Sequence, residues 1–334
     1  MTRVFIDARM AVRGLGIASA IERLEQALAQ RPDSTVTVNR SAHGWTPRGK
    51  LDTVLRSGFL DLDPRLDPRT RRAAMVHYFG NTCPLQPSPQ TLVTVHDLMM
   101  LGSHSRKGRM LEALLVPGLL RRRAKVVAIT SRTADSLVTR LGLPARNIEV
   151  IPHGYRDLPV WDGPRTHVMM FGGSGDPRKR VDLGIRAYVQ YAARARKDAL
   201  PLVIAGRAGL SPEHLALTTH QAVRIEPDPD RGMLDRMLSR AACLLYPSAW
   251  EGYGLPILEA GEVGTPVVYD EGADIPQEPL GRHVFPARAA SADAFASSLA
   301  AAVANGPVHN ALSGRPTWSD VAARYAELYR EVAS

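Results

Sequence analysis

The stretch Leu245–Gly261, LYPSAWEGYGLPILEAG, places two glutamates, Glu251 and Glu259, on either side of a glycine-rich turn. The apolar run that leads into it, Cys243–Tyr246, predicts a short buried strand. Pro256 predicts the first turn of a helix, because the N–H that proline lacks has no helical partner at that position. The sequence therefore predicts a strand, a tight turn and a helix in succession, which is a unit of α/β folds.

The turn itself has the composition of an anion site. Gly252 and Gly254 let the backbone turn sharply and approach a ligand closely. The backbone N–H groups of Tyr253, Gly254 and Leu255 are expected at the positive end of a helix dipole. Glu259, predicted in the first turn of that helix, can accept hydrogen bonds from hydroxyl groups of the same ligand. A nucleoside diphosphate sugar carries both an anion and hydroxyls.

Short apolar runs bounded by turn residues alternate with helical segments along the chain. In the first half the predicted strands are Arg3–Asp7, Thr35–Asn39, Met75–Phe79, Leu92–His96, Lys125–Thr130 and Ile148–Pro152. In the second half they are His167–Phe171, Pro201–Ala205, Ala222–Ile225, Ala242–Tyr246, Pro266–Tyr269 and His283–Phe285. Such alternation predicts parallel sheets with ligand-binding loops at the carboxyl ends of the strands. The predicted fold class is α/β, with two Rossmann-like lobes facing across a cleft.

The length of 334 residues and the hydrophobic content of 45% suffice for two cores. The boundary is predicted near Gly154–Gly163, where prolines and glycines interrupt regular structure. The N-terminal domain then covers residues 1–155, and the C-terminal domain covers residues 156–315. A last helix, Trp318–Val332, is predicted to begin after Thr317 as its N-cap.

Several classes of protein are disfavoured by composition. The most apolar candidate for a membrane span, Met110–Leu120, contains Glu112 and Pro117, and no run approaches the length of about 18 residues that a span needs. The N-terminus lacks a signal-peptide pattern. The two cysteines, Cys83 and Cys243, lie too far apart to suggest a disulfide framework. These features predict a cytoplasmic protein.

Positive charge is concentrated in the first half of the chain. Residues 1–155 contain 23 Lys and Arg against 12 Asp and Glu, a net charge of +11, whereas residues 156–334 have a net charge of −2. The densest segments are Arg69–Arg72, Arg106–Arg109 and Arg121–Lys125. They could face an anionic or lipid-linked acceptor or a membrane surface, and a merely solvated surface is an equal alternative. No aromatic residues are interleaved, so nucleic acid is not expected as a partner.

The pattern PSxWEGYGLPxLEA around Glu251 and Glu259 resembles the signature of the family 4 glycosyltransferases. The resemblance implies a retaining enzyme with the GT-B fold. It further implies that residues 1–155 bind the acceptor and residues 156–315 bind a UDP- or GDP-sugar donor. The segment 316–334 would form a helix that crosses back to the first lobe.

A second segment, Phe171–Arg180 or FGGSGDPRKR, is similar to the PRK element of the same family. The resemblance implies that Lys179, with Arg178 beside it, reaches the donor diphosphate, on which charge builds as the glycosidic bond breaks. As a merely structural residue, Lys179 would oppose the dipole of the following helix. Gly173 stands where many family members have an arginine. The candidates to replace that charge are Arg178, Arg180 and Arg207.

The first lobe carries weaker matches to the family. Gly14 and Gly16, in a loop before a predicted helix, resemble the glycine loop that touches the donor phosphates. His96, at the carboxyl end of a predicted strand, resembles the histidine that faces the transferred sugar, with Asp97 orienting the loop.

Two further positions at the end of the first lobe are open to more than one interpretation. The resemblance gives Thr130 and Ser131 a donor contact, although a helix N-cap explains Ser131 equally well. His153 stands where asparagine is common in the family.

The two acidic triplets of the chain, Asp61–Asp63 and Asp228–Asp230, are of a kind that another glycosyltransferase class uses to hold a divalent ion. Both lie in proline-rich loops away from the phosphate-binding turn. The helix end and Lys179 already supply positive charge, so neither a metal nor another cofactor is expected.

The sequence thus predicts a metal-independent, hexosyltransferase-like enzyme of polysaccharide, glycolipid or natural-product biosynthesis. It would transfer a sugar from a nucleoside diphosphate to an acceptor hydroxyl with retention of configuration. The predicted catalytic residues are His96, Glu251 and Lys179, and the predicted donor-binding residues are Gly14, Gly16, Arg178, Lys179, Gly252, Tyr253, Gly254, Leu255 and Glu259. The alternatives are an epimerase or phosphorylase on the same fold, and a non-catalytic binder of glycan or nucleic acid.

Overall fold

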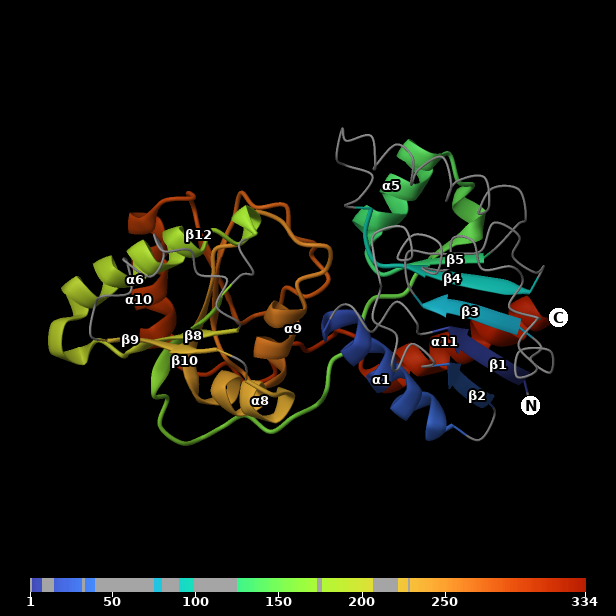
Figure 1. The fold of residues 1–334 in the computed structure, drawn as a ribbon, viewed down its shortest axis with the longest axis horizontal. Coiled ribbons are helices and arrows are strands. Elements are labelled where there is room, and N and C mark those ends of the chain that lie inside the picture. The colour runs from blue at the N-terminus through green and yellow to red at the C-terminus, as the bar shows by residue number, and fades with distance from the viewer. Residues whose placement is uncertain are drawn as a thin grey trace, which may run out of the picture. The chain divides into compact units, whose positions relative to one another are not determined.

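The computed structural model describes residues 2–7, 15–31, 34–39, 75–79, 90–98, 125–172, 176–206, 222–227 and 229–334. The chain divides into two compact units. Unit 1 comprises Met1–Gly154 together with Pro316–Ser334, and unit 2 comprises Tyr155–Arg315. Each unit is built on one parallel β-sheet (Figure 1).

The sheet of unit 1 has the strand order β2-β1-β3-β4-β5-β6. The strands are β1 (Thr2–Asp7), β2 (Ser34–Asn39), β3 (Met75–Phe79), β4 (Thr91–Val95), β5 (Lys125–Ala128) and β6 (Ile148–Val150). The helical segments in the described part of this unit are α1 (Leu15–Ala29), α5 (Ser131–Leu141), the 3₁₀ turn η4 (Ala145–Asn147) and α11 (Trp318–Ala333). Strands β3 and β4 pair in register up to Phe79 opposite Thr94, so their carboxyl ends lie side by side.

The sheet of unit 2 has the strand order β12-β11-β10-β7-β8-β9. The strands are β7 (His167–Phe171), β8 (Leu202–Ala205), β9 (Val223–Glu226), β10 (Ala241–Tyr246), β11 (Val267–Asp270) and β12 (Val284–Ala287). Among the described residues of unit 2, the helical segments are η5 (Pro177–Lys179), α6 (Val181–Ala195), η6 (Arg196–Asp198), α8 (Arg231–Arg240), α9 (Leu255–Glu262) and α10 (Ala292–Asn305). The order reverses between β7 and β10, which is where open α/β sheets bind ligands.

Strand β10 shows why the chain folds into layers. All six of its residues are buried, as expected for a parallel strand covered on both faces. Successive side chains of a strand point to opposite faces. Cys243 and Leu245 pack with residues of α6 and α10, whereas Leu244 and Tyr246 pack with residues of α8 and α9. Two helical layers therefore enclose this sheet.

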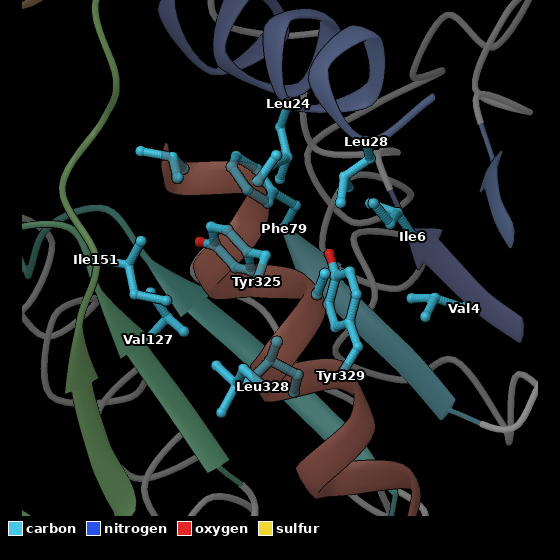
Figure 2. Packing of buried hydrophobic residues seen from close by; sticks show 14 of the residues in the cluster. Val4, Ile6, Leu24, Leu28, Phe79, Val127, Ile151, Tyr325, Leu328 and Tyr329 are labelled. Atoms are coloured by element: carbon cyan, nitrogen blue, oxygen red, sulfur yellow. The ribbon is translucent and has the colours of Figure 1, made fainter. Parts of the chain in front are cut away.

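Helix α11 belongs to unit 1, although it follows unit 2 in the sequence. Thr317 and Asp320 form a capping box at its start, which satisfies backbone N–H groups that the helix leaves without partners. Tyr325, Leu328 and Tyr329 pack into one core with residues of α1, β1 and β3 (Figure 2). Burial of each such side chain contributes about 1.5–3 kcal/mol.

The predicted fold class is confirmed in its α/β character, its two Rossmann-like sheets and the return of the last helix to the first lobe. The twelve predicted strands are all present, with bounds that differ by two residues at most. Of the helices in the described residues, none has both the length and the apolar character that a membrane span requires.

Candidate active site

The loops after β7 and β10 meet at the switch point of unit 2. The first loop leads into η5, which ends at Lys179, and the second runs from Pro247 to the start of α9. The backbone N–H of Ala249 donates to the carbonyl oxygen of Arg178 at 2.8 Å, which ties the two loops together. Strand order thus brings Lys179 and Glu251 together, although 72 positions separate them in the sequence.

Glu251 is the centre of this meeting point. Its Oε1 accepts hydrogen bonds from Lys179 Nζ at 2.6 Å, Ser248 Oγ at 2.6 Å and the Tyr246 hydroxyl at 2.7 Å. Its Oε2 accepts from Arg178 Nη1 at 3.0 Å. The residue is only 7% exposed, so these donors replace water around the carboxylate. Two predicted cations and one predicted glutamate therefore form a single ion-pair cluster.

The electrostatics of the cluster keep Glu251 ionised. Burial alone would raise the pKa of this carboxyl, but the charge of Lys179 and the hydrogen bonds from Lys179, Ser248 and Tyr246 outweigh it and lower the pKa below its ordinary value. Burial and the neighbouring carboxylate raise the pKa of Tyr246 well above its ordinary value, so the phenol keeps its proton and donates. A charged acceptor thus sits among fixed donors.

Both cations also lie on aromatic rings. The guanidinium carbon of Arg178 is 4.6 Å from the centre of the Trp250 ring, and Lys179 Nζ is 5.4 Å from the centre of the Tyr246 ring. A cation over a ring face is attracted by the ring quadrupole. Arg178 is further held by Asp176, whose Oδ2 accepts from Nε at 2.6 Å. These contacts orient the cations before any substrate arrives.

Helix α9 begins directly after the predicted glycine turn. Gly254, its N-cap, has φ of 94°, a left-handed conformation that strains any residue with a Cβ. Pro256 occupies the first turn, and the cap carries no side-chain hydrogen bond. Glu259 is the fifth residue of the helix, so its prediction in the first turn is wrong by one turn. The helix begins at Leu255, which leaves Glu259 on its second turn.

Glu259 is held by a residue that sequence analysis missed. Its Oε1 accepts from Arg231 Nη1 at 2.6 Å, and Arg231 Nη2 lies 2.9 Å from Asp235 Oδ1. The guanidinium of Arg156 binds the other side of Asp235 and also Glu262. Five charged side chains from α8, α9 and the segment after Gly154 are therefore linked in series.

His96 lies in unit 1, one residue beyond β4. It is 5% exposed, and its ring centre is 5.1 Å from that of Phe79 and 5.5 Å from that of His153. The ring of His153 in turn lies 5.7 Å from that of Trp318 at the start of α11. Burial lowers the pKa of His96 to about 4, so the imidazole is neutral at neutral pH. A neutral imidazole can donate one hydrogen bond and accept another.

A buried polar chain beside His96 joins α11 to the sheet. His77 Nδ1 lies 2.9 Å from the Tyr329 hydroxyl, and His77 Nε2 lies 2.7 Å from Thr94 Oγ1. Thr94 Oγ1 is also 3.0 Å from the Tyr325 hydroxyl. Since buried polar groups are costly without partners, these bonds fix the register of α11 on β3 and β4.

Other predicted residues are placed differently from the sequence interpretation. Gly16 lies in the first turn of α1 rather than in a loop before the helix, because the helix begins at Leu15. The N-cap of α5 is Thr130, whose side chain accepts from the N–H of Thr133, so Ser131 is not the cap. Asp230 caps α8 by accepting from the N–H of Met233.

Several predictions fall on positions outside the described residues. These are Gly14, Gly173, Arg207, Asp228, the triplet Asp61–Asp63 and the arginine-rich segments up to Ala124. Arg180, a candidate to replace the charge missing at Gly173, donates to Asp270 at 2.6 Å. Arg178 is the candidate that joins Lys179 on Glu251.

Some of the missed residues have a signal in the sequence. Ser248 lies inside the family pattern and Tyr246 directly precedes it, and hydroxyl groups so close to Glu251 in the sequence are candidate donors to its carboxylate. Arg231 and Asp235 have the (i, i+4) spacing of a helical ion pair. Nothing local pairs Arg156 with Glu262, which lie 106 positions apart.

Both halves of the chain match families of known proteins. Residues 16–157 match the family described as Glycosyltransferase Family 4, and residues 164–314 match the family described as Glycosyl transferases group 1. The O-antigen chain mannosyltransferase B of Escherichia coli is 27% identical over 169 residues, which cover 46% of this chain and 42% of that protein. The D-inositol 3-phosphate glycosyltransferase of Kribbella flavida is 31% identical over 169 residues, which cover 43% of this chain and 39% of that protein.

The chain therefore spans about two fifths of the length of both relatives. The fold extends over a whole solved structure, the sucrose-phosphate synthase of Thermosynechococcus elongatus. It aligns with a TM-score of 0.63 and 17% identity over 99% of each chain.

Proposed function

We propose that this chain is a group 1 glycosyltransferase and that it transfers a sugar from a nucleoside diphosphate sugar to an acceptor hydroxyl with retention of anomeric configuration. The observation that carries the proposal is the cluster of Lys179, Arg178 and Glu251 beside the start of α9. Cations, a carboxylate and a helix N-terminus at a sheet switch point suit a ligand with both phosphates and hydroxyls.

Each part of the donor has a proposed partner. The diphosphate binds Lys179 and the backbone turn Gly252–Leu255, with Arg178 supporting Lys179. Glu251 accepts hydrogen bonds from hydroxyls of the transferred sugar, and Glu259 accepts them from the ribose. The neutral imidazole of His96 is the proposed hydrogen-bond partner of the reacting sugar.

In the proposed reaction, the bond between the anomeric carbon and the diphosphate oxygen breaks, and its electron pair leaves with the diphosphate. The acceptor oxygen bonds to the same carbon on the same face of the ring. Its proton goes to the departing phosphate. Lys179 stabilises the charge that develops on the leaving group, an electrostatic role that carries much of enzymatic catalysis. No step requires a metal ion, and a metal-independent, hexosyltransferase-like enzyme of family 4 is proposed.

The acceptor is proposed to be a glycan or a lipid-linked glycan, in polysaccharide, glycolipid or natural-product biosynthesis. A similar protein named O-antigen chain mannosyltransferase supports this class. The net charge of +11 over residues 1–155 favours an anionic or membrane-borne acceptor. Peripheral contact with a membrane is proposed on the same ground, for a protein that is proposed to be cytoplasmic.

The test is a donor panel with matched variants. Purified protein is incubated with UDP- and GDP-sugars, and release of the nucleoside diphosphate is measured. We expect one nucleotide class to be consumed, and Lys179→Ala to lower turnover by about 10²–10³-fold, the effect of losing one preorganised electrostatic contact. Lys197→Ala, an exposed lysine of η6, is the control and should leave turnover unchanged.

A second variant separates transfer from binding. Glu251→Gln removes the carboxylate that holds Lys179, so we expect the free nucleoside diphosphate to bind at least as tightly while turnover falls. Binding of glycan without consumption of any donor would instead support a non-catalytic binder. Full activity of Lys179→Ala would overturn the proposed site.

A further inference from the structure

Five charged side chains alternate in sign across one side of unit 2. Glu262 Oε2 lies 2.7 Å from Arg156 Nη2, and Arg156 Nη1 lies 2.9 Å from Asp235 Oδ2. Asp235 Oδ1 lies 2.9 Å from Arg231 Nη2, and Arg231 Nη1 lies 2.6 Å from Glu259 Oε1. We call this series, from Glu262 to Glu259, the ion-pair ladder.

The Glu262 end of the ladder is rigid. The Glu262 side chain is 0% exposed, and it accepts from both the backbone N–H and the guanidinium of Arg156. Arg156 also forms two parallel hydrogen bonds with Asp235, the geometry that gives arginine its directional specificity. Burial works against the charge of Arg156, but the bonds to Asp235 and Glu262 raise its pKa, so the guanidinium stays charged.

The Glu259 end of the ladder is more open. The side chain of Arg231 is 42% exposed, whereas Asp235 and Arg156 are more buried. Arg231 and Asp235 are one turn apart on α8, and Glu259 and Glu262 are one turn apart on α9. The ladder therefore holds the facing sides of α8 and α9 together. It also connects Glu259, through Arg231, Asp235 and Arg156, to the buried carboxylate of Glu262.

We propose that Arg231 is a positioning residue that orients the Glu259 carboxylate for recognition of the ribose hydroxyls, and that Asp235 and Arg156 hold Arg231 for this task. The inference rests on the proposed function of Glu259. A carboxylate has about four acceptor positions, so it can accept from Arg231 and from ribose hydroxyls at once. A glutamate fixed beforehand loses less side-chain entropy when the ligand binds.

The test measures discrimination between ribose and deoxyribose. Binding of UDP and GDP, and of their forms that lack the 2′- or 3′-hydroxyl, is measured by calorimetry on the full chain. We expect the wild type to prefer the ribonucleotide by about tenfold or more, the factor for one charge-assisted hydrogen bond. Arg231→Met should reduce this ratio about fivefold by weakening ribonucleotide binding alone, the scale of one side chain's ordering.

Three further variants sharpen the result. Arg231→Lys should restore part of the ratio, and Asp235→Asn should lower it less than Arg231→Met does. Arg236→Met, an exposed arginine on the same helix, is the matched control and should behave as wild type. If Arg231→Met does not fold, the lysine and Asp235→Asn variants give the same test.

The outcomes separate two failures. If Glu259→Gln keeps the wild-type ratio, or if no nucleotide binds, the proposed role of Glu259 fails. If Glu259→Gln abolishes the ratio but Arg231→Met leaves it unchanged, this inference alone is overturned. An increased ratio in Arg231→Met would also overturn it, because Arg231 would then compete with ribose for the carboxylate.

Discussion

Units 1 and 2 share a sheet architecture but hold their candidate residues by different means. In unit 1, the ring of His96 lies against those of Phe79 and His153, and the ring of His153 lies against that of Trp318. Nearby polar side chains are joined by hydrogen bonds between neutral groups. In unit 2, Glu251 and Glu259 are held by charged partners. One scaffold therefore positions its residues by packing, and the other by charge.

The difference affects how easily the residues of each unit can leave their partners and bind a ligand. The rings around His96 are buried, so a change there disturbs the core of unit 1. Lys179 and Arg178 are partly exposed, and an incoming anion can compete for them without disturbing the core. Partly exposed ion pairs suit the part of a protein that binds and releases a charged ligand.

Acidification should produce the largest difference in stability between the two units. Burial, with a smaller effect of His96, lowers the pKa of His77 to about 3, burial lowers the pKa of His96 to about 4, and the pKa of His153 is also well below its ordinary value. In the unfolded chain these groups titrate near 6.5. The unfolded state then binds protons that the folded state does not, so stability present above pH 6.5 is lost as pH falls toward 4, by about 1.4 kcal/mol per pH unit for each group.

Among the residues that the structure describes, unit 2 contributes fewer such groups. Burial lowers the pKa of His283 to about 4, and burial also lowers the pKa of His167. Hydrogen exchange at pH 7, 6 and 5, corrected for intrinsic rates, should show protection lost in β3 and β4 before β7 and β10. His153→Asn should reduce the pH dependence of unit 1 by one proton. Earlier loss in unit 2 would contradict the comparison.

Removal of a charge from the buried end of the ladder should produce the next largest effect. Glu262→Gln removes the buried charged partner of Arg156, which then keeps Asp235 alone, and the loss should cost about 3 kcal/mol, the low end for breaking a buried pair. Urea unfolding measures the change. Glu271→Gln, at an exposed position, is the control and should shift stability by about 0.5 kcal/mol at most. A change of that small size in Glu262→Gln would show that the ion pair of Glu262 and Arg156 does not stabilise unit 2.

A neutral bond in unit 1 should have a smaller effect. Tyr325→Phe removes the hydroxyl that bonds with Thr94 and should cost about 1 kcal/mol, since Thr94 keeps its bond to His77. Because both partners are uncharged, the loss should be the same at low and high salt in urea unfolding. If the loss of stability became smaller with added salt, an electrostatic interaction, rather than a hydrogen bond between neutral groups, would hold α11 on the sheet.

Chelation should have the smallest effect. The cations Lys179 and Arg178 and the end of α9 supply positive charge that EDTA does not remove. Initial rates of the proposed transfer should therefore stay within about twofold, well under the 1.4 kcal/mol of a tenfold change. Inactivation by EDTA, reversed by manganese or magnesium, would mean that unit 2 needs a metal ion to supply positive charge at the proposed diphosphate site.

Much of the fold could be predicted because its determinants are local. Strands β3 and β7 were predicted with the observed bounds, since a strand buried on both faces is a continuous apolar run between turn residues. The N-cap Thr317 is also predictable, because a capping residue bonds with backbone groups only a few positions away. Gly16 was misplaced because glycine is tolerated in helices as well as in turns, and the packing of α1 decides between them.

The candidate site was predictable in its residues but not in its contacts. Lys179 and Glu251 both lie in recognisable motifs, yet their contact depends on the neighbouring positions of β7 and β10 in the sheet. Strand order is a long-range property that no local pattern contains. The same reason hides the partner of Glu259, because Arg231 reaches it only when α8 and α9 pack together.

The position of α11 also sets an order of events during translation. All of residues 155–315 leave the ribosome before residues 316–334, so unit 2 can complete its core while unit 1 still lacks a helix. Until α11 arrives, apolar side chains of α1 and β1, among them Leu24 and Val4, have no cover from it. Uncovered apolar surface of this kind is what chaperones recognise and what promotes aggregation. Of the two units, unit 1 is thus the one whose synthesis begins earlier and whose core is completed later.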